Sequence, residues 1–222
     1  MWPPRTLAIT DSERLADAGG DADARLLAFV AAVAAAGVDA VQIRERHWDE
    51  RRVLRVTREA LAAVRGTTCR VMVNERADVA VAAGAHGVHL RGSGMPAARV
   101  RAAWPSGLVI GRSVHVGDDS EVAHGADFVL FGTVFRSVSK AASAPVAGLA
   151  ALRGWARQAG LPPVLAVGGI DDPARCEAVR EAGACGIAGI DLFVRAFRQG
   201  PASLAAVVGE VHEVFRDQGR AE

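Results

Sequence analysis

The stretch from Leu108 to Gly132 reads LVIGRSVHVGDDSEVAHGADFVLFG and contains two short apolar runs with a helical segment between them. The runs Leu108–Val114 and Phe128–Gly132 have the length and the nearly continuous apolar character of strands buried on both faces. The segment Asp118–His124 has room for a helix, and Gly125 follows where a helix should stop. The stretch therefore predicts a β-α-β unit of a parallel sheet.

The same unit repeats along the whole chain. Further apolar runs occur at Thr6–Thr10, Ala40–Arg44, Arg70–Asn74, Gly87–Leu90, Val164–Gly168 and Ala184–Ile190. Helices are expected at Asp23–Ala36, Asp49–Arg65, Arg76–Ala83, Pro96–Ala103, Gly148–Ala159, Pro173–Ala182 and Ala202–Arg216. Eight strand-helix units in 222 residues predict an α/β protein with one domain over residues 1–222, a single (β/α)8 TIM barrel. An open doubly wound sheet is the alternative.

Composition excludes several classes of protein. Half of the residues are hydrophobic and the net charge is +1, which argues against disorder and against a general nucleic-acid surface. The longest apolar run, Leu26–Val38, is too short to span a membrane. Met1–Arg5 shows no apolar leader, and the three cysteines are scattered, so we expect a reduced, cytoplasmic protein. A homodimer is expected because twofold dimers are the commonest oligomers.

The polar residues that follow the apolar runs are informative, because barrel sites lie at the carboxyl ends of the strands. These residues are Gln42, Arg44, Arg46, Asn74, Glu75, His89, Arg91, Arg112, Ser113, His115, Thr133, Ser137, Ser139 and Lys140. Arginines, hydroxyls and a lysine on one rim predict an anion pocket, with phosphate as the expected ligand. The alternative for any one of them is a solvated rim residue.

Two features sharpen the phosphate prediction. Lys140 is the only lysine in the chain and lies among hydroxyl residues, where its ammonium could contact a phosphate oxygen. Val167–Ile170 and Gly186–Ile190 end the last two runs, and their glycines, Gly169 and Gly189 among them, would let backbone N–H groups approach an anion. Tight packing would require the same glycines, so both explanations stay open.

Candidates for proton transfer are His115 and His89, which follow or end predicted strands. Glu75 could hold Mg²⁺, but one carboxylate makes a weak metal site. We therefore expect no metal.

At these residues the sequence resembles the thiamine phosphate synthase superfamily of barrels, including its thiazole tautomerase (TenI-like) branch. The motifs that carry the resemblance are Val41–Arg46, Val73–Asp78, Val88–Leu90, Ile110–His115, Asp127–Gly132, Ser137–Lys140 and Val167–Ile170. Each motif is weak by itself, but seven in order at barrel spacing are specific.

The resemblance implies ligands for these residues. In the synthase a pyrimidine pyrophosphate and a thiazole phosphate condense to thiamine phosphate, with Mg²⁺ on the pyrophosphate. Positions for the pyrophosphate match Arg44, Arg46, Asn74, Ser113 and Lys140, and positions near the pyrimidine match Gln42 and His89. The thiazole-phosphate pocket matches Ser137, Ser139, Gly169 and the amides of Gly189 and Ile190.

The departures from the synthase pattern favour the tautomerase branch. The synthase has an aspartate at Glu75 and a second acid at Gly94, and losing one carboxylate should weaken Mg²⁺ binding. Arg46 also replaces the usual lysine. We therefore expect no cofactor, with Mg²⁺ required only if the protein is a synthase, and we expect an isomerase that aromatises a carboxythiazole phosphate by proton transfer.

One departure also affects this reading. Thr133 stands where the tautomerase has its proposed catalytic histidine, and a threonine hydroxyl is no base at neutral pH. His115, His89 or Glu75 would then move the proton, and His115 ranks first. The alternatives are thiamine phosphate synthase itself and a non-catalytic barrel that binds a phosphorylated ligand.

Overall fold

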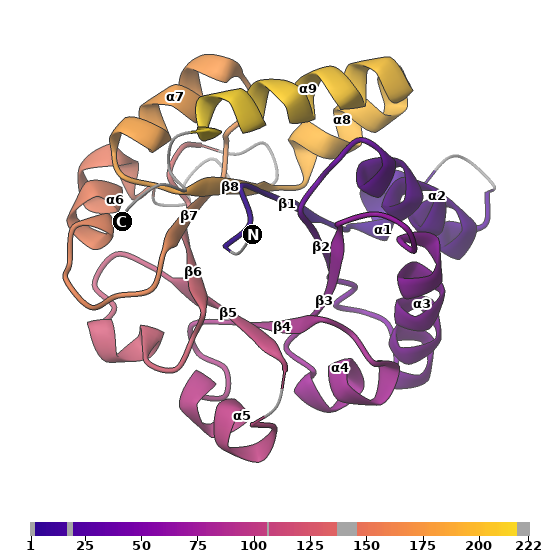
Figure 1. Ribbon diagram of the computed structural model, residues 1–222, viewed down its shortest axis with the longest axis horizontal. Helices are drawn as coiled ribbons and strands as arrows, with labels where there is room; N and C mark the ends of the chain where they lie inside the picture. The colour runs from indigo at the N-terminus through magenta and orange to yellow at the C-terminus, as the bar shows by residue number, and fades with distance from the viewer. Residues whose placement is uncertain (1–2, 17–19, 106, 137–145, 217–222) are drawn as a thin grey trace.

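Eight parallel strands close into a barrel, each strand pairing with the next and β8 pairing with β1 (Figure 1). The computed structural model describes residues 3–16, 20–105, 107–136 and 146–216. The strands are β1 Thr6–Ile9, β2 Ala40–Ile43, β3 Arg70–Asn74, β4 Gly87–Leu90, β5 Val109–Val114, β6 Phe128–Gly132, β7 Val164–Val167 and β8 Gly186–Gly189. The predicted TIM barrel is therefore confirmed, and the open sheet is wrong.

The helices surround the barrel (Figure 1). They are α1 Ser12–Leu15, α2 Ala22–Ala35, α3 Glu50–Ala63, α4 Ala77–Ala83, α5 Ala97–Ala103, α6 Gly148–Ala156, α7 Pro173–Glu181, α8 Asp191–Gln199 and α9 Pro201–Val214, with a 3₁₀ helix η1 at Ser120–Ala123. Local chemistry explains where α7 begins: the Asp172 carboxylate accepts a hydrogen bond from the Arg175 backbone N–H at 2.8 Å, and Pro173 is the first helical residue.

Three elements differ from the sequence expectations. The segment Asp118–His124 forms the single 3₁₀ turn η1, because only four of its residues are helical before Gly125 turns the chain. The short helix α1 was not predicted. Helix α8 was also missed, and it directly follows β8 at the carboxyl end of the barrel.

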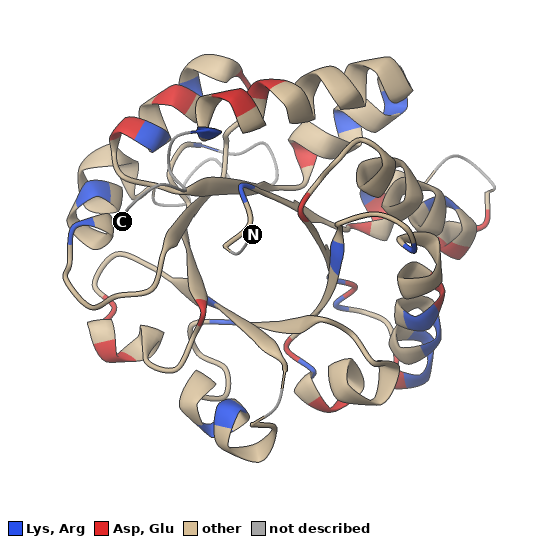
Figure 2. Cartoon of the chain, in the orientation of Figure 1, with Lys and Arg blue, Asp and Glu red and all other residues tan. Residues whose placement is uncertain are grey.

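Apolar side chains fill both the barrel and the layer around it. Leu7, Met72, Phe128 and Leu165 pack inside the barrel, and a larger cluster lies between the strands and the outer helices. Figure 2 shows charged residues concentrated on the helices and connecting loops, whereas the strands carry few of them. In the part of the chain that the structure describes, no helix is long and apolar enough to cross a membrane.

Candidate active site

The carboxyl ends of the strands surround one cavity of about 330 Å³. Its lining includes most of the predicted site residues: Gln42, Arg44, Arg46, Asn74, His89, Ser113, His115, Thr133, Gly169, Gly189 and Ile190. We call this cavity and its rim the mouth of the barrel. Ser137, Ser139 and Lys140 lie outside the described residues, so their predicted roles stay predictions.

Four polar side chains from neighbouring strands form two hydrogen-bonded pairs on the β2–β5 side of the mouth. The Gln42 side-chain amide donates to Asn74 Oδ1 at 2.9 Å, and His89 Nε2 lies 2.9 Å from Ser113 Oγ. Strand register sets these pairs: Gln42 lies opposite Met72 and His89 opposite Gly111, so Asn74 and Ser113 lie two residues further along the adjacent strands, on the same face. The pairing fixes the side chains before any ligand arrives, as a preorganised site requires.

The position of His89 depends on a glycine in the next strand. A Cβ atom at Gly111 would lie 2.7 Å from His89 Nδ1 and 2.5 Å from Phe128 Cζ. No larger residue fits there without moving the imidazole or a ring of the inner core. Gly111 therefore leaves the space that His89 occupies.

Burial sets the protonation state of His89. Removal from water, and then the charges of Arg112 and Arg44, lower the pKa of His89 to about 3. The imidazole is thus neutral at physiological pH, where it is a poor proton acceptor but a good hydrogen-bond partner. Its partner is Ser113 rather than His115, so we assign His89 a role in positioning.

Gln42 offers an unused acceptor to a ligand. The residue is only 1% exposed, and its Oε1 atom has no hydrogen-bond partner among the described residues. Buried polar atoms are almost always paired in folded proteins. A donor group on a bound molecule, such as an exocyclic amine, would satisfy this atom.

His115 is the exposed imidazole of the mouth. It lies just past the end of β5, where its backbone N–H donates to Asp118 Oδ2 at 2.8 Å and its Nδ1 lies 3.4 Å from the same oxygen. This contact leaves Nε2 as the ring atom available to a substrate. A carboxylate that holds one imidazole nitrogen while the other faces the ligand is a common acid/base arrangement.

Arginines dominate the charge of the mouth. Arg44, Arg46, Arg91, Arg136 and Arg195 line it, against the acids Asp171 and Asp191. Both acids already have partners, because Asp171 pairs with Arg175 and Asp191 with Arg14. Burial and, secondarily, the neighbouring Arg46 lower the pKa of Arg44, against the opposing effect of Asp11 and Glu45. We call Arg44, Arg46 and Arg91, which follow β2 and β4, the arginine side of the mouth.

Glu75 does not line the cavity, which corrects its predicted place in the site. Its Oε2 atom forms an ion pair with Arg91 Nε at 2.5 Å, and its Oε1 atom accepts from the Arg91 backbone N–H at 2.5 Å. Glu75 has a φ of 65°, a left-handed conformation that non-glycine residues rarely adopt. Both carboxylate oxygens are therefore engaged by a neighbouring arginine.

A second arginine fixes the loop that carries Arg91. The Arg112 side chain is 4% exposed and donates to the backbone carbonyls of Gly92, at 2.8 Å, and of Met95. Its guanidinium also lies 3.4 Å from the carbonyl oxygen of Gly94. The loop from Arg91 to Met95 is thereby held by a buried charge.

The opposite part of the mouth is built from backbone. Gly168 and Gly169 have φ values of 99° and 65°, and a Cβ atom at Gly168 would lie 2.3 Å from Thr133 Cγ2. Tight packing thus suffices to explain these two glycines, and their role in anion binding stays a prediction. We call Gly168, Gly169, Gly189 and Ile190 the glycine side; α8 begins directly after Ile190, and its N-terminus supplies partial positive charge.

The protein is a closed parallel (β/α)8 barrel whose cationic mouth lies at the carboxyl ends of the strands, where barrels of this class have their sites. Comparison of the sequence with known protein families identifies the particular family. The family model described as thiamine monophosphate synthase matches residues 7–193. The chain belongs to this family.

Curated relatives and a solved structure agree with this assignment. A putative thiamine-phosphate synthase of Geobacter sulfurreducens is 40% identical over 171 residues, which cover 76% of this chain and 79% of the relative. A thiamine-phosphate synthase of Anaeromyxobacter dehalogenans is 39% identical over 190 residues, with 83% and 80% covered. The structure of thiamine phosphate pyrophosphorylase from Pyrococcus furiosus superposes with a TM-score of 0.75 at 28% identity, covering 93% of this chain and 96% of that one.

Sequence reasoning missed part of the mouth. Arg136, Asp171, Asp191 and Arg195 line it but were not proposed as site residues. Arg195 lies on the unpredicted helix α8, and its guanidinium donates to the Asp171 carbonyl at 2.7 Å. The amphipathic sequence of α8, with Leu192 and Phe193 buried, was the available signal.

Proposed function

We propose that the protein joins a pyrimidine diphosphate to a thiazole phosphate, the condensation that gives thiamine phosphate. The observation that carries the proposal is the two-sided mouth, in which cationic side chains and a glycine-rich backbone face one cavity. The condensation brings together a diphosphate and a phosphate monoester, and the arginine side and the glycine side can bind one each. The synthase names of the relatives support the same choice.

The condensation has a simple electron balance. The bond between the pyrimidine methylene carbon and the diphosphate oxygen breaks, and its electron pair leaves with the diphosphate. The lone pair of the thiazole nitrogen then forms the new carbon–nitrogen bond. Negative charge develops on the leaving diphosphate, so the cations that face it lower the barrier.

The residues of this chain take separate parts in that reaction. Arg44 and Arg46 bind the diphosphate, and Asn74 positions the Gln42 amide to which it is hydrogen bonded. Gln42 Oε1 accepts a hydrogen bond from the pyrimidine amine. The glycine side holds the thiazole phosphate, and the apolar floor formed by Ile9, Leu130 and Ala188 excludes water beneath the reacting rings.

The residues present do not fit the Mg²⁺ ion that the family implies. Mg²⁺ requires carboxylate or other oxygen ligands in octahedral geometry. Glu75 gives both of its oxygens to Arg91, and the second acid position of the family is Gly94. Within the described ranges, no group of three His, Cys, Asp or Glu residues could hold a metal. No step of the mechanism is therefore derived through a metal.

The donor set favours a second candidate, the isomerisation of a carboxythiazole phosphate. This reaction needs an acid/base and an anion site but no metal. His115, held by Asp118, would transfer the proton, since Thr133 cannot and His89 is a poor base.

Incubation with defined substrates separates the candidates. The protein is given each thiazole phosphate isomer, with and without the pyrimidine diphosphate and Mg²⁺, and the products are separated by chromatography. Thiamine phosphate in the two-substrate reaction supports the condensation. Aromatisation of a single thiazole substrate without condensation supports the isomerase, and binding without turnover contradicts both.

A further inference from the structure

The Glu75–Arg91 pair carries an inference that rests on the proposed diphosphate-binding function of the mouth. The loop from Arg91 to Met95 places a guanidinium, not a carboxylate, at the rim beside Glu75. The Arg91 side chain is 62% exposed and lines the cavity, while the Glu75 side chain is 20% exposed and does not line it. The cation is therefore more accessible to a ligand in the cavity than the anion.

We propose that Arg91, held by Glu75, is a diphosphate-binding cation that replaces a divalent metal at this rim. Glu75 then acts as a positioning residue for the guanidinium rather than as a metal ligand. Guanidinium groups bind phosphate oxygens in a bidentate manner and keep their charge at any physiological pH. Diphosphate binding by this protein is accordingly independent of Mg²⁺.

The geometry of Glu75 supports this assignment. Two contacts from the same residue, the side-chain Nε and the backbone N–H of Arg91, engage the two carboxylate oxygens separately. The Glu75 backbone N–H donates to the His89 carbonyl at 2.8 Å, which helps to hold its left-handed conformation. The carboxylate is thus fixed toward the loop on which Arg91 lies.

The loop itself is built for a guanidinium and leaves little room for a second acid. A Cβ atom at Gly94 would lie 2.9 Å from Glu75 Oε1 and 3.2 Å from the Arg91 carbonyl oxygen. The Arg112 contacts to the carbonyls of Gly92 and Met95 hold the loop in this arrangement. A carboxylate at this position would have to displace the Arg91–Glu75 contacts.

Charge in the rest of the arginine side favours the same ligand class. Arg44 and Arg46 line the cavity together with Arg91, whereas the acids that act on them, Asp11, Glu45 and Glu75, do not line it. Three guanidiniums match the several negative charges of a diphosphate better than those of a single phosphate monoester. The ligand class is therefore a diphosphate, free or esterified.

Calorimetry with inorganic pyrophosphate tests the inference. The wild-type protein is titrated in EDTA and again in excess Mg²⁺. We expect binding in EDTA, with an affinity that Mg²⁺ does not increase. Binding that appears only with Mg²⁺, or that Mg²⁺ strengthens by about tenfold or more, would overturn the inference.

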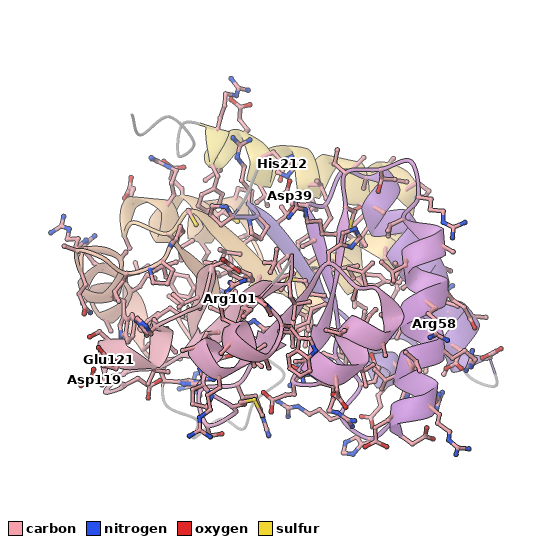
Figure 3. All side chains as sticks on the ribbon, turned by 60° about the horizontal axis from the view of Figure 1, so that its bottom comes forward. Asp39, Arg58, Arg101, Asp119, Glu121 and His212 are labelled. Carbon is pink, nitrogen blue, oxygen red and sulfur yellow. The ribbon has the colours of Figure 1, made fainter. Side chains whose placement is uncertain are left out.

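Matched variants assign the effect to Arg91. Arg91→Gln should weaken pyrophosphate binding in EDTA by at least about tenfold, because a charge-assisted contact is lost. Arg58→Ala, which removes an exposed arginine of α3 away from the mouth (Figure 3), should stay within about twofold of the wild type. An unchanged affinity for Arg91→Gln in a protein with a wild-type melting temperature contradicts the proposal.

The outcome can be separated from the proposed condensation. Metal-free pyrophosphate binding without thiamine phosphate formation would leave this inference standing and remove the proposed function. Condensation with pyrophosphate binding that requires Mg²⁺ would do the opposite.

Discussion

The two ends of the barrel use polar residues in opposite ways. At the amino-terminal end, Asp39 Oδ2 accepts from the backbone N–H groups of Arg5 and Thr6, both at 2.9 Å, and from Thr6 Oγ1 at 3.0 Å. His212 on α9 lies 3.2 Å from the same oxygen, and Figure 3 shows the two side chains together at this end. Several donors therefore converge on one carboxylate oxygen.

At the mouth, by contrast, polar groups keep unused capacity. Gln42 Oε1 lacks a partner among the described residues, and the His115 ring is held at only one nitrogen. Polar groups satisfied within the protein stabilise a fold, and groups left open can bind a ligand. The amino-terminal end thus stabilises the fold, whereas the mouth gives up stability in order to bind a ligand.

The largest expected effect is at His115 and tests whether the mouth performs acid/base chemistry. If the reaction is the isomerisation, His115→Ala should lower kcat by about 10²–10⁴-fold, because it removes the group that transfers the proton. In the condensation the bond-forming step moves no proton, so kcat should change by less than about threefold. Steady-state kinetics with both substrate sets measures this.

His124→Ala is the matched control for that measurement. His124 is an exposed histidine in the same β5–β6 connection, but it does not line the mouth. Its kcat should equal the wild-type value in either assay. A comparable loss in both variants would show that the connection, not the imidazole, matters.

The next effect concerns packing on the glycine side of the mouth. Gly168→Ala should destabilise the protein by about 3 to 4 kcal/mol, because the new methyl group meets Thr133 and the backbone has a positive φ. Gly189→Ala is the control, since its nearest neighbour would be Phe193 at 3.8 Å, an ordinary contact. Urea denaturation should show less than about 1 kcal/mol for this control. Equal losses would refute the packing explanation of Gly168.

A smaller effect is expected at the amino-terminal end. Asp39→Ala should cost about 2 to 3 kcal/mol of unfolding free energy, because partly buried donors lose their acceptor. Pyrophosphate affinity should not change, since Asp39 lies at the opposite end of the barrel from the mouth. A loss of pyrophosphate affinity in the folded variant would show that the amino-terminal end also affects ligand binding at the mouth.

The sequence predicted the strands well because buried parallel strands are short apolar runs separated by helices. The end of each run then placed Gln42, Asn74, His89 and Ser113 at one rim, as the structure confirms. This inference needed only the barrel and the direction of its strands. Strand ends are therefore the most predictable part of the site.

The remaining features depend on contacts between distant segments. Arg91 is one of many arginines in the sequence, and only the structure shows its pairing with Glu75, sixteen residues earlier. Helix α8 was missed because a single residue, Gly200, separates it from α9. The neutral state of His89 follows from burial, which the sequence pattern does not quantify.

The smallest effect is an acid-dependent loss of stability caused by His89. Burial, with Arg112 and Arg44, holds its pKa at about 3 in the folded protein, whereas the unfolded chain takes up the proton near pH 6.5. The unfolded state therefore binds more protons between these values, and the stability contributed by a neutral His89 is lost as the pH falls below about 6.5. Between pH 6.5 and pH 5 the loss should be about 2 kcal/mol.

Burial also lowers the pKa of His86, which acts in the same direction. The wild type is therefore compared with His89→Gln by urea denaturation at each pH. The variant should lose less stability than the wild type over this range. Asp39 does not interfere, because hydrogen bonds from His212 and Thr6 outweigh burial and lower its pKa, and its contribution is lost only below about pH 4. Identical pH dependence in the two proteins would mean that His89 is protonated in the folded state, and it would return this residue to the candidates for acid/base catalysis at the mouth.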